Sequence, residues 1–205
     1  MSQATEGVRT LANVITVART TVSLALGVVA LAENSLTWLV AAYAVYWVGD
    51  IADGMAARWR DEETVIGAVF DVICDRLNTT VAAAAFVAIT PEVAPAIGLF
   101  LFEFCVVDTM LTLAFLYFPG LISPNYFWQI DRPIYRWNWS PAAKAGNTAI
   151  VVLLCLIGQV WLAVAWAAAV TVVKVLSLRR LHAILHHRIE AAPKPDGVAA
   201  NPIFG

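Results

Sequence analysis

Long apolar segments alternate with short polar connections along most of the chain. A helix of about 20 apolar residues spans the hydrocarbon core of a bilayer, so this pattern predicts membrane-spanning helices. The six predicted helices cover residues 11–32, 36–58, 65–90, 93–118, 141–158 and 160–181. We therefore expect an all-α polytopic membrane protein, with one six-helix domain over residues 1–190 and a disordered tail at 191–205.

The composition agrees with this interpretation. Of the 205 residues, 60% are hydrophobic and only 14% are charged, whereas soluble domains are about half apolar and a quarter charged. The formal net charge is −2 and no basic run occurs, so nothing in the sequence indicates nucleic-acid binding.

The basic residues are distributed to one side of the predicted bundle. The short connections at 33–35, 91–92 and 158–160 contain no lysine or arginine. The residues near the opposite helix ends are Arg9, Arg58, Arg60, Arg132, Arg136, Lys144, Arg179, Arg180 and Arg188. Because positive charge is retained on the cytoplasmic side, we expect both termini to be cytoplasmic, in an integral protein of a bacterial cytoplasmic membrane.

The segment from Gly49 to Arg76, "GDIADGMAARWRDEETVIGAVFDVICDR", carries five aspartates within otherwise apolar sequence. Asp50 and Asp53 are three residues apart near the end of one predicted helix, and Asp71 and Asp75 are four apart near the start of the next. Each pair shares one helix face. Because the two helices form an antiparallel hairpin, all four carboxylates are predicted to lie at similar depth.

Four carboxylates at the edge of the hydrocarbon would repel one another and be costly to desolvate. A divalent cation relieves both costs, and carboxylate oxygens suit Mg²⁺ or Mn²⁺, with room for two ions. The alternative is that each aspartate forms an intramembrane ion pair or lies at the surface.

Small residues and one arginine accompany these acids. Gly54 and Gly67 have no Cβ and Ala57 has little more, so a ligand can approach the helices closely. Arg58, one turn beyond Gly54, offers a planar cation suited to phosphate. Together these residues predict a site for a diphosphate.

The pattern Asp50-xx-Asp53-Gly54-xx-Ala57-Arg58-x8-Gly67-xxx-Asp71-xxx-Asp75 resembles the signature of the CDP-alcohol phosphotransferase family. The resemblance implies a six-helix, homodimeric membrane enzyme whose site faces the cytoplasm. It also implies that the four aspartates bind metal and that Asp75 deprotonates the acceptor hydroxyl. The residues that the resemblance places at CDP are Gly54, Ala57, Arg58 and Gly67.

The first predicted helix adds three polar residues on one face, Asn13, Thr16 and Arg19. Their N-xx-T-xx-R pattern resembles the start of bacterial phosphatidylglycerophosphate synthases, which implies contacts with the nucleotide and its phosphates. Hydrogen bonding between helices is the alternative. Arg19 in particular requires an anionic partner inside the membrane.

The acceptor is less well defined by the sequence. Members that use glycerol phosphate commonly have an arginine before the acid that Asp108 resembles, and this chain has Val107 there. The residues we expect near the acceptor are Arg76, Asp108, Arg132, Arg136 and Lys144. The aromatic residues of the 119–140 connection most simply form an interfacial belt, and a loop that covers the substrate is the alternative.

These features predict a phospholipid-synthesising transferase. It would move a phosphatidyl group from CDP-diacylglycerol to an alcohol that resembles glycerol phosphate or phosphatidylglycerol, and release CMP. One alternative keeps the chemistry but uses a CDP-alcohol donor and a lipid alcohol such as diacylglycerol. Another alternative, of a different class, is a divalent-cation or proton transporter whose carboxylates form the path.

Overall fold

The computed structural model describes residues 9–191, and the regular elements of this part of the chain are all helices, with no strand. Apart from Ala191, the tail predicted at 191–205 lies outside the described residues. The α-helices are α1 (Leu11–Ala32), α2 (Leu36–Trp59), α3 (Val65–Ile89), α4 (Ala94–Phe102), α5 (Thr109–Leu113), α6 (Arg132–Asn138), α7 (Pro141–Leu156) and α8 (Val160–Ala191). The predicted all-α architecture is confirmed, and α8 continues past residue 181, where the predicted membrane span ends.

Side-chain caps fix where several helices begin. Thr10 accepts a hydrogen bond from the backbone N–H of Asn13 at the start of α1, and Thr64 accepts one from Gly67 at the start of α3. Ser140 caps α7 in the same way. Each cap satisfies a backbone donor that the first helical turn leaves unpaired, and two of them lie beside the candidate site.

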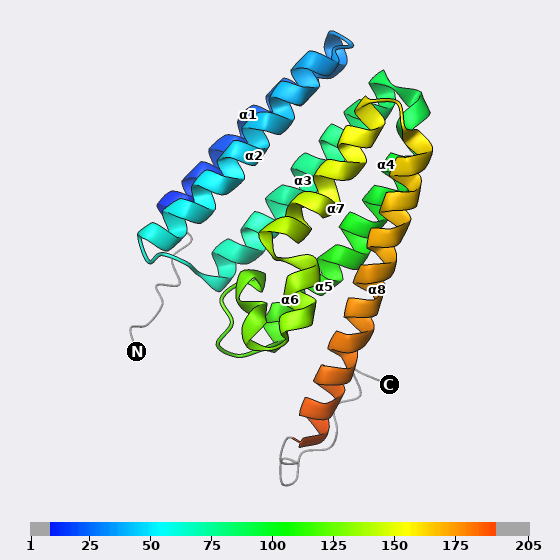
Figure 1. Ribbon diagram of the computed structural model, residues 1–205. Coiled ribbons are helices and arrows are strands. Elements are labelled where there is room, and N and C mark those ends of the chain that lie inside the picture. Colours follow the sequence, from blue (N-terminus) through cyan, green and yellow to red (C-terminus); the bar gives the residue numbers. More distant parts are fainter. Residues whose placement is uncertain (1–8, 192–205) are drawn as a thin grey trace, which may run out of the picture.

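The helices are arranged as a hairpin beside a bundle. In Figure 1, α1 and α2 run side by side on one flank, and α3, α4, α7 and α8 lie on the other. Most contacts between the two groups come from α1, which packs against both α2 and α3. The start of α1, the α2–α3 connection, α6 and the end of α8 all lie at the lower end of the view.

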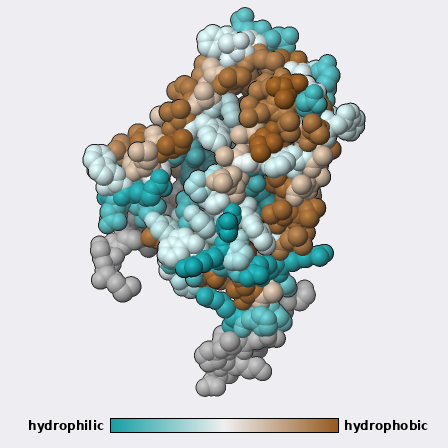
Figure 2. All heavy atoms as spheres, in the orientation of Figure 1, coloured by the Kyte–Doolittle hydropathy of each residue, from teal (hydrophilic) through white to brown (hydrophobic). Residues whose placement is uncertain are grey.

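Five regions of the described chain are long and apolar enough to cross a membrane: Leu11–Ala32, Val65–Ile89, Pro91–Tyr117, Arg132–Leu156 and Val160–Arg188. The one predicted span that is not among these five is α2. It is a 24-residue helix, as expected, but it contains Asp50, Asp53 and Arg58 and is less apolar than the other spans. Figure 2 shows hydrophobic atoms over much of the upper surface and hydrophilic atoms gathered toward the lower end. This distribution fits an integral membrane protein.

The helix predicted at 93–118 contains a wider turn that the sequence did not reveal. Residues Glu103–Asp108 form the π-helix η2 between α4 and α5. Asp108 follows Glu103 by five positions. In an α-helix, which has 3.6 residues per turn, two side chains at this spacing would point to different sides. The π turn places both acids beside Lys174 of α8, which forms ion pairs with each of them.

The connection at 119–140 is folded and packed, and of the tryptophans expected in an interfacial belt Trp139 is buried. It contains the 3₁₀-helix η4 (Pro124–Gln129) and α6. Phe127 and Trp139 are buried in one apolar cluster with Phe115, whereas Trp128 and Trp137 are each 46% exposed. Tyr126 donates a hydrogen bond to Glu63 in the α2–α3 connection, which ties this segment to the helices that carry the aspartates.

Candidate functional site

Three of the predicted carboxylates lie close together between α2 and α3. Asp50 and Asp53 of α2 and Asp71 of α3 each offer an oxygen, and the three oxygens lie within 4.8 Å of one another. The fourth residue, Asp75, is linked to these three through Arg19, which forms ion pairs with all four aspartates. The convergence expected from the antiparallel hairpin is therefore what the structure shows.

The shared cation is Arg19 of α1. Its Nε donates to Asp53 at 2.7 Å, and its Nη2 lies 2.5 Å from Asp71 and 2.9 Å from Asp75. The same nitrogen is 3.5 Å from an Asp50 oxygen. One guanidinium thus contacts all four aspartates, which confirms the expectation that Arg19 has an anionic partner and identifies that partner as the carboxylate cluster.

Arg19 reaches this position because a neighbouring helix leaves room for it. A Cβ at Gly49 would overlap the Cβ of Arg19 and lie 2.6 Å from its Cδ. The guanidinium also lies over the ring of Tyr46, 5.1 Å from the centroid, a favourable arrangement for a cation. The lack of a side chain at Gly49 is therefore required for α1 and α2 to approach each other at Arg19.

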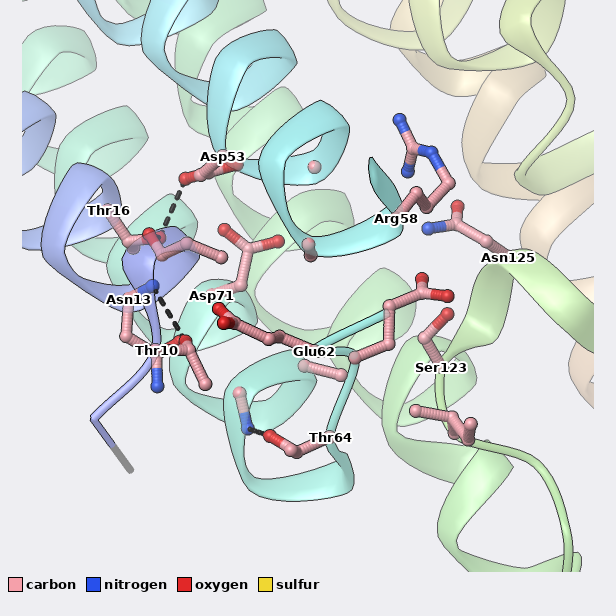
Figure 3. Close-up of a pocket in the computed structure, with 17 residues that line it drawn as sticks. Thr10, Asn13, Thr16, Asp53, Arg58, Glu62, Thr64, Asp71, Ser123 and Asn125 are labelled. Carbon is pink, nitrogen blue, oxygen red and sulfur yellow. Dashed lines mark hydrogen bonds between the residues drawn. The ribbon is translucent and has the colours of Figure 1, made fainter. Parts of the chain in front are cut away.

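A cavity opens next to the carboxylates, with an empty volume of about 540 Å³ that includes open solvent at its mouth. Figure 3 shows Thr10, Asn13 and Thr16 on one side of it, and Arg58, Ser123 and Asn125 on the other. The remaining lining residues are Ala12, Asp53, Gly54, Ala57, Glu62, Glu63, Thr64, Gly67, Ala68, Asp71 and Ile122.

Gly67 allows α1 and α3 to meet at the floor of the cavity. A Cβ there would lie 2.9 Å from Thr64 Oγ1 and 3.2 Å from Asn13 Oδ1. Thr16 Oγ1 donates to Asp53 at 2.7 Å, so the first helix both lines the cavity and supports an aspartate. Interhelical hydrogen bonding and ligand contact, the two interpretations of these polar residues, are compatible here.

The donor set fits a divalent cation of the kind that prefers oxygen. The ligands on offer are carboxylates alone, and Arg19 is the one side chain seen to contact all of them among the described residues. Four carboxylates and one guanidinium leave a formal charge of −3 in a partly buried place. That surplus favours the binding of further positive charge.

The expected acceptor residues are dispersed. Arg76 forms an ion pair with Asp108, and its guanidinium stacks 3.7 Å from the Phe104 ring centroid. Lys144 donates to Asn125 at 2.9 Å and so reaches the rim of the cavity. Arg132 and Arg136 are exposed and are not among the residues that line the cavity.

Several residues of the cavity carried no signal in the sequence. Glu62 accepts hydrogen bonds from the backbone of Leu11 and from Arg60, and the bond from Arg60 lowers the pKa of Glu62. Its neighbour Glu63 accepts from Tyr126, and that bond raises the pKa of Tyr126, which therefore stays a donor at neutral pH. Glu62 and Glu63 lie inside the signature at positions that it leaves open, and Tyr126 is distant in sequence from it. Only the fold brings Tyr126 to the site.

Comparison with known proteins gives one match. A family model described as CDP-alcohol phosphatidyltransferase matches residues 9–173. No curated protein and no solved structure matches significantly. The matched region includes every aspartate of the cluster, Arg19, Arg58 and Lys144.

Substitution of Arg19 by methionine tests its role in the cluster. We expect the free energy of unfolding in EDTA-containing buffer to fall by about 3 kcal/mol, because loss of one partner leaves buried charge uncompensated. The measurement is thermal unfolding of the purified protein in detergent. Arg60→Met is the matched control, since Arg60 forms an exposed pair with Glu62. Equal melting temperatures for both variants would contradict the role.

Proposed function

The chain belongs to the CDP-alcohol phosphatidyltransferase family, and from that premise we propose that it transfers a phosphatidyl group from CDP-diacylglycerol to an alcohol and releases CMP. The observation that carries the proposal is the meeting of Asp50, Asp53 and Asp71 at one edge of a polar cavity that Arg58 also lines. A carboxylate cluster beside a cationic group suits a diphosphate.

We assign distinct roles to the two sides of the cavity. Asp50, Asp53, Asp71 and Asp75 would hold one or two Mg²⁺ or Mn²⁺ ions, which when bound neutralise charge on the phosphate oxygens. Arg58 would hold a phosphate by its planar donors. Gly54, Ala57 and Gly67 would leave space for the nucleotide, and Asn13 and Thr16 would contact it.

The chemical step is a substitution at phosphorus. The acceptor oxygen forms a bond to the phosphorus that carries the diacylglycerol, and the bond from that phosphorus to the bridging oxygen breaks, so CMP departs. Asp75 would take the proton from the acceptor hydroxyl, which is the role that the family resemblance implies. Its carboxylate belongs to the cluster through Arg19, and its side chain is 24% exposed.

The orientation in the membrane belongs to the same proposal. We place all six long helical regions across the bilayer and both termini in the cytoplasm, since the basic residues lie toward the end of the molecule that carries the cavity. The acyl chains of the donor would then remain in the bilayer while the CDP group enters from the cytoplasm. The homodimer implied by the resemblance stays a prediction.

One observation favours a second candidate with the same chemistry. The buried cations Arg76 and Lys174 are already paired with Asp108 and Glu103. Pairing with carboxylates makes these two cations less available to an anionic acceptor, which favours a neutral one, although Arg132 and Arg136 are exposed. A CDP-alcohol donor and a lipid alcohol such as diacylglycerol would satisfy this constraint.

Replacement of Asp75 by asparagine should abolish proton transfer and preserve the shape of the site. We expect CMP release to fall by about 10²–10⁴-fold, as for loss of a general base, while CDP-diacylglycerol binding stays within a few-fold of wild type. Labelled donor gives both measurements. Asp61→Asn, in the connection, serves as the control. Loss of donor binding would instead show that Asp75 is needed as a ligand rather than as a base.

Removal of divalent cations provides a separate test of the aspartate cluster. EDTA should stop CMP release, and Mg²⁺ or Mn²⁺ should restore it, because the uncompensated carboxylates would repel the diphosphate. Undiminished turnover in EDTA would refute the metal assignment. Passage of Mn²⁺ into sealed vesicles without any CMP release would favour the transport alternative.

An acceptor panel distinguishes the two candidate reactions. Purified protein is supplied with labelled CDP-diacylglycerol and glycerol phosphate, phosphatidylglycerol or a neutral alcohol, and separately with a CDP-alcohol and diacylglycerol. We expect lipid product with CDP-diacylglycerol, and with a neutral acceptor in preference to glycerol phosphate. Product from the CDP-alcohol reaction alone would establish the second candidate.

A further inference from the structure

The 119–140 segment contributes one wall of the cavity, at Ile122, Ser123 and Asn125. Ser123 is only 6% exposed, and its Oγ makes no hydrogen bond to any group in the described part of the chain. A buried hydroxyl without a partner costs free energy. A polar atom left in this condition in a residue that lines the cavity can form its missing bond with a ligand.

The neighbouring amide is held in one orientation. Lys144 Nζ lies 2.9 Å from Asn125 Oδ1, and because an ammonium group only donates, the oxygen of the amide must face the lysine. The amide nitrogen is then directed away from Lys144, and Figure 3 shows it turned toward Arg58 and the cavity. Asn125 thus presents two hydrogen-bond donors to whatever occupies this wall.

The α2–α3 connection brings hydrogen-bond acceptors to the same cavity. Glu62 and Glu63 line the cavity, and the bond from Tyr126 to Glu63 anchors η4 against the α2–α3 connection. Two carboxylates would repel a phosphate group, but they accept hydrogen bonds from hydroxyl or amino groups. The chemistry therefore suits an uncharged polar group that both donates and accepts, such as a ribose or the edge of a pyrimidine.

We propose that Ser123 and Asn125 form a subsite for the nucleoside part of the CDP-linked donor, with Lys144 as the positioning residue that orients the Asn125 amide. This inference rests on the proposed function and adds the part of the donor that the 119–140 segment recognises. It also gives Lys144 a role at the donor, in contrast to the acceptor role expected from the sequence.

The test measures CMP binding to the purified protein by calorimetry, with Ser123→Ala, Asn125→Asp and Lys144→Met. We expect the Kd for CMP to rise about three- to tenfold for each, the effect of one lost neutral hydrogen bond. Gln129→Ala is the matched control, because Gln129 is exposed on the same 3₁₀-helix and is not among the cavity-lining residues. Binding of inorganic pyrophosphate should be unchanged in Ser123→Ala.

Thermal stability separates ligand binding from a structural role. Ser123→Ala should leave the melting temperature of the free protein equal or higher, because it removes a hydroxyl that has no partner, and should reduce the shift that CMP produces. Wild-type affinity for CMP in both Ser123→Ala and Asn125→Asp would overturn the subsite alone. Equal losses for CMP and pyrophosphate would identify a phosphate contact and overturn the nucleoside assignment. No CMP binding by the wild type would overturn the proposed function as well.

Discussion

The structure depends on how the electrostatic repulsion among four aspartates is offset at the edge of an apolar bundle. Repulsion between carboxylates grows as water is excluded, so Asp50, Asp53, Asp71 and Asp75 can share this place only with positive charge among them. Arg19 supplies part of it from α1. This requirement explains why α1 packs against both α2 and α3, and why Gly49 has no side chain at the point of contact.

Helix α3 connects this cluster to a second one deeper in the bundle. Adjacent residues on α3 take part in different clusters: Asp75 contacts Arg19, and Arg76 contacts Asp108. In the second cluster the formal charges cancel. Lys174 pairs with both Glu103 and Asp108, and Arg76 pairs with Asp108. The first cluster retains an excess of negative charge and the second does not, so only the first is suited to attract further cations.

Much of this could be predicted from the sequence, because helical periodicity and hydropathy are local properties. The spacing of the aspartates and the antiparallel order of two helices were enough to predict that they converge. The position of Arg19 among them was not predictable, since it depends on how α1 crosses its neighbours. The π turn at Glu103–Asp108 and the inward wall at Ser123 and Asn125 likewise arise from packing between distant segments, for which the sequence has no periodic signal.

The two walls of the cavity differ in a way that bears on how a lipid-linked nucleotide would be oriented. The carboxylate cluster is built on long helices that continue into the apolar part of the bundle, whereas Ser123 and Asn125 belong to a compact segment at its polar end. The groups of a CDP-diacylglycerol donor follow the same order as these parts of the protein. Its diacylglycerol is apolar, its diphosphate is anionic, and its nucleoside is polar and uncharged. Under the proposed function, this order of groups along the cavity would place the scissile phosphate beside the aspartates and the nucleoside beside Ser123 and Asn125.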